Sequence, residues 1–404
     1  MANRNETGIF QQENGYWAYR YTITIDGKKR ERKGTKDEFG NRLRTKTAAI
    51  KARDASRIAE ISKQQPTEEI TRKTFKEVYT EYCATGRADR AYKTKLKQDS
   101  LWDNHLCSRF GGRYVDDISV AEVNDYLSEL YFVNQLSFRY VESFLKMFYL
   151  ILGQAYSRNY LSIAKYSKLC KNKDTRIHMP KIKDEDDTAI VAFNRDELAI
   201  LDDYFKGTNA ETAYLLGRYC GLRINESFGL KWDHVDLDAG IIRIDRQMQY
   251  QEGLIKLVPV KTRNGRREVY MCDKLKVYFQ TLAAKREKDT VQYAALREQK
   301  QRFIDDLDGS KISSTELVNC LPNGTIQTVN SFKYPSREIK GRLGINFKYH
   351  FLRHTYGTMM AELNTPQHLL CSQMGHGNIH VTQRYYLGIT KTGVSLLREK
   401  LEQL

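Results

Sequence analysis

The chain has 404 residues, with 66 Lys or Arg against 50 Asp or Glu, which gives a formal net charge of +16 at pH 7. Hydrophobic residues at 41% are enough for two or three packed domains, while charged residues at 29% predict a soluble protein and exclude a membrane-embedded one. The basic excess favours a polyanionic partner, most simply nucleic acid, although a solvated basic surface would give the same sum.

Seven cysteines are dispersed along the chain without a CxxC pair. Such a pattern predicts a reducing compartment and neither a disulfide framework nor a zinc site. The first ten residues lack the apolar segment of a signal peptide, and no apolar run approaches the ~20 residues of a membrane span. We therefore expect a cytoplasmic, nucleoid-associated protein with no membrane partner and no metal.

Residues 1–65 predict a small three-stranded sheet backed by one helix. Aromatic and β-branched residues alternate with polar ones over 16–25, Asp26-Gly27 is a strong hairpin turn, and a basic strand follows at 28–33. A short strand at 8–12 precedes them, and Thr45 can cap a helix near 46–61. Strands with basic residues on an open face suit a groove of DNA. The candidate contacts are Arg20, Lys28, Lys29, Arg30, Arg32 and Lys33.

Residues 73–172, after a linker at 64–69, predict a helical bundle. We expect helices near 74–85, 90–110, 119–131 and 136–158. Ser119 followed by Glu122 predicts a capping box at the start of the third helix. Lys93 and Lys95 belong to a basic edge near the start of the second helix and are further candidates for DNA contact.

Residues 185–404 predict a mixed domain after a charged linker at 171–187. Asn194 and Glu197 can cap its first helix, and strands are expected near 241–246, 254–260 and 267–271. The turn Lys261–Gly265 joins the last two strands, with Asn-Gly at its tip. Residues 285–306 are interpreted as a charged helical insertion, and a last helix is expected near 394–403. The predicted fold class is multidomain α+β, mainly α with small β-sheets.

The stretch 348–387 carries the densest set of reactive side chains. Apolar residues recur at three- or four-residue spacing at Leu352, Tyr356, Met360 and Leu363, which predicts a helix with one buried face. His350 and Arg353 are three residues apart and are expected to project together, off that buried face.

Two further short helices are expected in the same stretch. Pro366 suits the first turn of one helix and Gly375 its end, so that His376 falls in a loop. Asn378 can cap the next helix, which carries Tyr385. Groups that could hold a phosphate and attack it therefore lie on short, well-terminated elements.

His350-x-x-Arg353, then Gly375-His376, then Tyr385 nine positions later resembles the tyrosine recombinases, the phage-type integrases. That family also has an Arg in a G-L-R-x-x-E box, which residues 221–226 match, and a Lys in a β-hairpin, which Lys261 fits. The matches span roughly 160 residues of the chain. The resemblance is nearest to three-domain integrases of phages, integrative conjugative elements and conjugative transposons.

The resemblance implies an arm-binding domain at 1–65, a core-binding domain at 73–172 and a catalytic domain at 185–404. Guanidinium forks suit the non-bridging oxygens of a phosphodiester. The expected roles are a phosphate clamp (Arg223, Arg353), a third donor (His376), the nucleophile (Tyr385), a general base (His350), a proton donor to the leaving 5′ oxygen (Lys261), an orienting carboxylate (Glu226) and a phosphate contact (Arg263). A 3′-phosphotyrosyl intermediate would need no cofactor, metal or ATP.

The resemblance also implies partners. They are double-stranded DNA with core-type and arm-type attachment sites, three further copies of the chain in a synaptic tetramer, and an excisionase or DNA-bending helper. The segment Val394–Leu404 is expected to dock onto a neighbouring copy.

Several alternatives remain open at the level of sequence. The same residues would serve a type IB topoisomerase-like enzyme that relaxes DNA, or a catalytically silent DNA-binding protein on the same fold. His350 and His354 have the spacing of metal ligands, but no Glu lies between them as in HExxH. His354, His368 and His380 are interpreted as surface or packing residues, and Tyr386 is the rival to Tyr385 as nucleophile.

Overall fold

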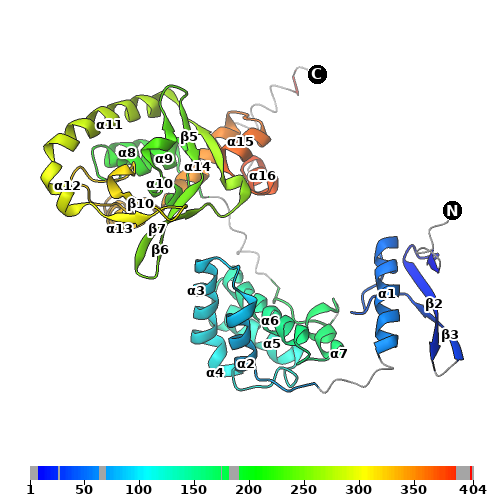
Figure 1. Ribbon diagram of the computed structural model, residues 1–404. Coiled ribbons are helices and arrows are strands. Elements are labelled where there is room, and N and C mark those ends of the chain that lie inside the picture. The colour runs from blue at the N-terminus through cyan, green and yellow to red at the C-terminus, as the bar shows by residue number, and fades with distance from the viewer. Residues whose placement is uncertain are drawn as a thin grey trace. The chain divides into compact units, whose positions relative to one another are not determined.

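The computed structural model describes residues 8–25, 28–62, 70–173, 175–181, 191–387 and 401–402. They belong to two compact units, Met1–Asp187 and Thr188–Leu404, and are mainly helical with small sheets, as predicted (Figure 1). The predicted turn at Asp26-Gly27 and the linker at 64–69 lie outside the described residues, as does the last helix apart from two positions.

The first unit begins with an antiparallel sheet in the order β1-β2-β3, packed against one helix (Figure 1). These elements are β1 (Ile9–Gln11), β2 (Trp17–Ile25), β3 (Lys28–Gly34) and α1 (Lys46–Ser62). Ala49 and Ala52 of α1 pack on Tyr19 and Leu43, and Thr45 Oγ1 accepts a hydrogen bond from the backbone of Ala48. The three strands and the helix are confirmed.

The register of β2 and β3 divides the basic residues between the two faces of the sheet. Arg20 lies opposite Lys33, on the face away from α1, because directly opposed residues share a face. Arg30 lies opposite Ile23 and Arg32 opposite Tyr21, on the face that α1 covers, and Arg32 is 3.5 Å from Glu60 of α1. The expectation that the basic residues share one open face is therefore wrong, although Arg30 itself is exposed.

The rest of the first unit is a helical bundle. Its α-helices are α2 (Phe75–Glu81), α3 (Tyr92–Leu101), α4 (Cys107–Phe110), α5 (Val120–Ser128), α6 (Phe138–Ser157) and α7 (Ile163–Tyr166). Phe148 of α6 is fully buried, and its ring centroid lies 5.0 Å from Phe110 and 6.2 Å from Phe75. Ser119 caps α5 as predicted, but the capping box is not formed because the Glu122 side chain pairs with Arg113.

The second unit combines helices with two sheets, ordered β10-β9-β7-β6 and β4-β5-β8. The strands are β4 (Val235–Asp236), β5 (Ile241–Ile244), β6 (Arg246–Gln251), β7 (Leu254–Pro259), β8 (Arg267–Tyr270), β9 (Phe303–Asp305) and β10 (Lys311–Ser313). The helices are α8 (Arg195–Phe205), α9 (Glu211–Cys220), α10 (Ile224–Phe228), α11 (Asp273–Gln292), α12 (Ala294–Lys300), α13 (Lys333–Leu343), α14 (Tyr349–Glu362), α15 (Gln367–Met374) and α16 (Ile379–Leu387). Asn194 and Glu197 form the expected capping box of α8.

Two predictions for this unit are wrong in detail. The turn Lys261–Gly265 is not a hairpin, because β7 pairs with β6 and β9 whereas β8 pairs with β5 in the other sheet. The hairpin is β6–β7, whose two-residue turn, Glu252-Gly253, has positive φ at both positions. The stretch 285–306 is not a helical insertion throughout, since it ends in β9, a strand beside β7.

Replacing Phe148 with Ala should lower the free energy of unfolding of the first unit by about 3–5 kcal/mol, because the change leaves a cavity beside the rings of Phe75, Phe110 and Tyr126. Urea denaturation followed by tryptophan fluorescence measures the loss. Phe132→Ala is the matched control, since that ring is 47% exposed and should cost about 1 kcal/mol or less. Equal losses in the two variants would contradict the placement of Phe148 at the centre of the bundle.

Candidate active site

Arg223 stands at the junction of two helices. Gly221 ends α9 in the left-handed conformation, at φ 62°, and a Cβ there would come within 2.6 Å of the Tyr356 ring. Two residues later Arg223 is the N-cap of α10, and its guanidinium donates to Glu226 at 2.7 Å and to the Gly375 carbonyl at 3.1 Å. Its side chain is 39% exposed, so part of the guanidinium faces solvent.

Arg353 is buried in α14, at 2% exposed, which contradicts the expectation that it projects off the buried face. Its guanidinium donates to the Gly221 carbonyl at 2.7 Å and to the Met374 carbonyl at 2.6 Å, and these acceptors offset the cost of burial. Burial and the charge of Arg223 lower the pKa of Arg353 to about 9, which leaves it charged at neutral pH.

Leu363, predicted to be on the buried face, is 72% exposed because α14 ends at Glu362.

The backbone carbonyls at the end of α15 and in the loop after it accept hydrogen bonds from the arginine side chains. Four consecutive carbonyls, of residues 373 to 376, each accept a hydrogen bond from another part of the second unit. The donors in order are Arg267 (2.8 Å), Arg353 (2.6 Å), Arg223 (3.1 Å) and Asn264 (3.2 Å). A helix C-terminus has unpaired carbonyls and partial negative charge, so it suits cations. Three guanidinium groups therefore converge beside His376.

Glu226 is the counter-charge within this group and is 2% exposed. Its carboxylate lies 2.7 Å from Arg223 and 2.9 Å from Arg267, and it also accepts from the backbone of Arg223. Burial alone would raise the pKa of Glu226, but the charges and hydrogen bonds of Arg267 and Arg223 outweigh it and lower the pKa to about 2.

Sequence reasoning did not single out Arg267. Its side chain is only 3% exposed, whereas the adjacent Arg266 is exposed. In the sequence the two stand side by side in a basic turn, and only the register of β8 shows which one points inward.

His376 and Tyr385 lie next to each other and both are buried, at 6% and 8% exposed. Their rings are nearly parallel, with centroids 6.2 Å apart, and His376 Nδ1 is 2.8 Å from Thr382 Oγ1. Burial and the charges of Arg353 and Arg223 lower the pKa of His376 to about 3, so it is neutral at pH 7. Burial raises the pKa of Tyr385, while the arginines around it act in the opposite direction.

Two further histidines extend this group on α14. The ring of His350 lies 4.6 Å from that of His354, which in turn lies 6.2 Å from Tyr385. Partial burial and the neighbouring charges of His354 and Arg353 lower the pKa of His350 to about 4. His354 was expected to be a surface or packing residue, yet it contacts the Tyr385 ring. Its four-residue spacing from His350 was the signal.

Lys261 and Arg263 are exposed on the turn that follows β7. This turn touches the site through Asn264, whose side chain donates to the His376 carbonyl. Lys93 is exposed on α3, and Lys95 is half-buried and donates to the Ala88 carbonyl at 3.2 Å. The structure thus brings together Arg223, Glu226, Arg353, His376 and Tyr385, with the Lys261 turn against them.

Within the described ranges no three His, Cys, Asp or Glu side chains are grouped so that they could hold a metal ion. Nor does any helix among the described residues have the length and apolar composition required to cross a bilayer.

Comparison with known proteins gives consistent matches over most of the chain. The phage integrase family model matches residues 195–389, and a model of the phage integrase N-terminal SAM-like domain matches residues 74–131. A tyrosine recombinase XerC-like protein of Caldanaerobacter subterraneus is 25% identical over 389 residues, which cover 93% of either chain. The transposase of transposon Tn916 from Enterococcus faecalis is 27% identical over 172 residues, 42% of this chain and 40% of its own.

Solved structures share the fold. A Tn1549 transposon integrase fragment in complex with transposon right-end DNA aligns with a TM-score of 0.64 at 18% identity, over 82% of this chain and 100% of that one. A lambda integrase tetramer bound to a Holliday junction aligns with a TM-score of 0.51 at 13% identity, over 95% and 96% of the two chains.

Replacing Glu226 with Gln should lower the free energy of unfolding at pH 7 by about 3 kcal/mol, because Arg267 is left buried without its counter-charge. The lowered pKa of Glu226 means that its stabilisation is complete above its ordinary pKa of 4.5 and is lost as the pH falls through about 2. The difference between wild type and variant, measured by urea denaturation, should therefore be constant at neutral pH and shrink below pH 4.5. Glu268→Gln is the control, because Glu268 is exposed on β8, the strand that carries Arg267. A difference that grows on acidification would contradict the assignment.

Proposed function

The chain belongs to the phage integrase family of tyrosine recombinases, site-specific enzymes that break and rejoin DNA, and on that premise we propose that Tyr385 is its nucleophile. We propose further that it integrates and excises a mobile element through a 3′-phosphotyrosyl intermediate. The observation that carries the proposal is the convergence of Arg223, Arg353 and His376 on one helix end beside the Tyr385 ring.

The arginines are the phosphate clamp of this proposal. A guanidinium has five N–H donors, and Arg353 uses two of them on the carbonyls of Gly221 and Met374. Arg223, at 39% exposed, presents its free edge to solvent. Both can therefore donate to the non-bridging oxygens of a phosphodiester without leaving their anchors. Donors held in this way stabilise charge that develops on phosphorus in the transition state.

The reaction proceeds by exchange of one phosphoester bond for another. Tyr385 Oη attacks phosphorus, its proton passes to His350, and the bond from phosphorus to the 5′ oxygen breaks as Lys261 gives a proton to that oxygen. The products are a 3′-phosphotyrosine and a 5′ hydroxyl, and the reverse steps rejoin DNA with a new 5′ end. His350 is neutral at pH 7 because its pKa is lowered to about 4, so it is in the form that accepts a proton.

Tyr385 is favoured over Tyr386 by their surroundings. The Tyr386 hydroxyl donates to the backbone carbonyl of Thr365, which engages it away from the arginines. The Tyr385 ring instead lies against His376 and His354, and the charges of Arg353 and Arg223 act on its pKa. These cations favour the phenolate that must attack.

The other parts of the chain supply binding in this proposal. Residues 73–172 bind core-type DNA with Lys93 and Lys95, residues 185–404 perform the chemistry, and Arg263 adds a phosphate contact near the site. Residues 1–65 bind a separate arm-type site, which a topoisomerase that only relaxes DNA would not require. The active complex is a tetramer on two DNA sites in the cytoplasm, at the nucleoid, with an excisionase or DNA-bending protein as helper.

Tyr385→Phe should abolish the covalent protein–DNA adduct formed on a nicked suicide substrate, because the attacking oxygen is gone. Tyr386→Phe is the matched control and should keep the adduct. Denaturing gel electrophoresis with labelled DNA measures both. An adduct that persists in Tyr385→Phe would rule out this nucleophile.

Arg20→Ala with Lys33→Ala should weaken binding to arm-type DNA about tenfold or more at physiological salt, since two charges leave the open face of the sheet. The paired control is Arg32→Ala, whose side chain lies toward α1 beside Glu60. The arm-site DNA is first identified by sequencing DNA trapped on the protein. Fluorescence anisotropy with that DNA then gives the dissociation constants. A greater loss in the control than in the double variant would refute binding by the open face.

A further inference from the structure

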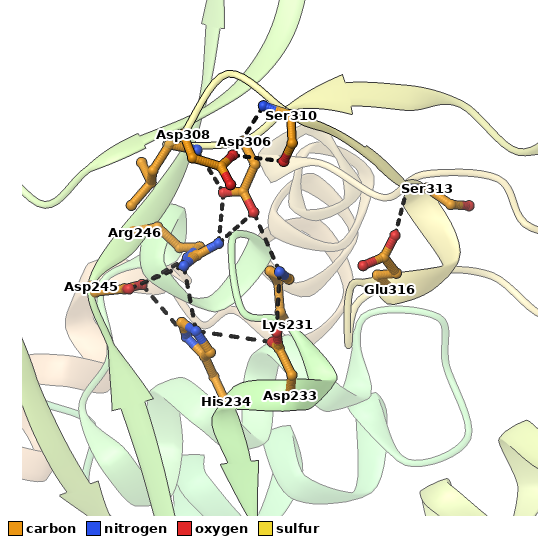
Figure 2. Close-up of polar contacts among 11 residues, drawn as sticks. Lys231, Asp233, His234, Asp245, Arg246, Asp306, Asp308, Ser310, Ser313 and Glu316 are labelled. Atoms are coloured by element: carbon orange, nitrogen blue, oxygen red, sulfur yellow. Dashed lines mark hydrogen bonds and ion pairs between the residues drawn. The ribbon is translucent and has the colours of Figure 1, made fainter.

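A second group of charged side chains lies in the catalytic unit, apart from the proposed catalytic residues (Figure 2). Its centre is the carboxylate of Asp306, which is 7% exposed and lies 2.6 Å from Arg246 and 3.3 Å from Lys231. The remaining members are Asp233, His234 and Asp245, and Figure 2 shows how all six side chains point toward one another.

The guanidinium of Arg246 is the link between two carboxylates. It reaches Asp306 with one terminal nitrogen and grips Asp245 with Nε, at 2.7 Å, and with its other terminal nitrogen, at 3.1 Å. Burial alone would raise the pKa of Asp245, but the hydrogen bonds and charge of Arg246 prevail and lower it. The ion pair of Arg246 with Asp245 is therefore formed at neutral pH.

Arg246 and Asp306 lie on either side of β7, the strand that leads to Lys261. Arg246 is the first residue of β6 and Asp306 directly follows β9, and β6 and β9 are the two neighbours of β7 in their sheet. The pair of Arg246 and Asp306 thus connects the strands on either side of β7. Arg246 lies opposite Pro259, and the Asp245 carbonyl accepts a hydrogen bond from the Val260 backbone at 3.2 Å. Lys261 is the next residue.

The sheet itself holds this end of β7 weakly on one side. β7 and β9 share one register pair, Lys256 with Asp305, whereas β6 and β7 are paired over six positions. The ion pair of Arg246 with Asp306 supplies a second connection to β9. The two-nitrogen contact of Arg246 with Asp245 fixes the plane of the guanidinium that makes this pair. Lys261 is exposed, with a long and flexible side chain, so its direction depends on where the backbone of β7 ends.

We propose that Arg246 and Asp306 are positioning residues that clamp the end of β7 and so aim the Lys261 ammonium at the leaving 5′ oxygen. The proposal rests on the proton-donor role of Lys261 given above. It also assigns a purpose to the end of the 285–306 stretch, which carries the acidic half of the clamp.

The test uses two suicide substrates that differ in one atom, the 5′ bridging oxygen or a sulfur in its place. A thiolate leaves without a proton because its conjugate acid is far more acidic than an alcohol, so sulfur removes the need for Lys261. Lys261→Ala should slow cleavage of the oxygen substrate by about a hundredfold or more. On the sulfur substrate the same variant should cleave at the wild-type rate. Asp306→Asn should slow the oxygen substrate about tenfold to a hundredfold and likewise be restored on sulfur.

Three companion variants complete the test. Asp308→Asn is the matched control, because Asp308 lies in the same turn but hydrogen-bonds to Ser310, and it should cleave both substrates as wild type does. Arg246→Lys keeps the charge and loses the fork, so it should show a smaller loss on oxygen with the same recovery on sulfur, even if Asp306→Asn folds poorly. The double variant Lys261→Ala with Asp306→Asn should be no slower on oxygen than Lys261→Ala alone.

The outcomes distinguish the positioning role of Arg246 and Asp306 from the proton-donor role of Lys261. If sulfur restores Lys261→Ala but neither Asp306→Asn nor Arg246→Lys, the ion pair serves only stability and the clamp is refuted. Unchanged oxygen cleavage in both clamp variants also refutes it. If sulfur fails to restore Lys261→Ala, the proton-donor role falls, and the clamp proposal falls with it.

Discussion

The hydrogen bonds that the end of α15 accepts are the constraint on which the catalytic unit depends. Arg223, Arg267 and Arg353 come from α10, β8 and α14, and three guanidinium groups at close range would repel one another in isolation. Consecutive carbonyls at a helix C-terminus, with the carboxylate of Glu226 among the arginines, hold them together. Gly375 makes this possible, because its φ of 65° turns the chain and a Cβ would come within 2.9 Å of Arg267.

The anchored arginines leave the site short of negative charge. Glu226 is shared by two of them. Burial, together with the cationic field of the arginines, lowers the pKa values of Arg353, His350 and His376. A phosphodiester that enters this field brings the missing anion, and its transition state brings more. Since the donors are already fixed by backbone contacts, little reorganisation accompanies the reaction. Burial and the same field keep His350 and His376 neutral, which suits the proton acceptor and the neutral donor proposed for them.

Local signals in the sequence predicted much of this arrangement. Gly375 ends α15 and Asn378 begins α16, as predicted. The family resemblance carried by Arg353, His376 and Tyr385 indicated which side chains meet. Pairing between distant strands was beyond such signals. The inward side of Arg267 and the α1-facing side of Arg32 depend on register, and a one-residue shift would reverse both. The separation of β7 from β8 depends on which distant strands pair with each of them. Arg353 was placed off the buried face because its acceptors, at residues 221 and 374, come from elsewhere in the fold.

The catalytic unit therefore supports its reactive groups in two different ways. Arg223, Arg353 and Tyr385 lie on or beside helices whose ends hold one another. The proposed phosphate clamp and the proposed nucleophile therefore have fixed positions. Lys261 stands on a turn between two sheets, fastened on one side by Asn264 and on the other by the strand that Arg246 and Asp306 flank. A proton donor held through a strand end can adjust to the leaving oxygen as the bond lengthens, while the grip on phosphorus stays unchanged. Removing the ion pair of Arg246 with Asp306 should then slow proton transfer to the leaving oxygen and leave phosphate binding unchanged.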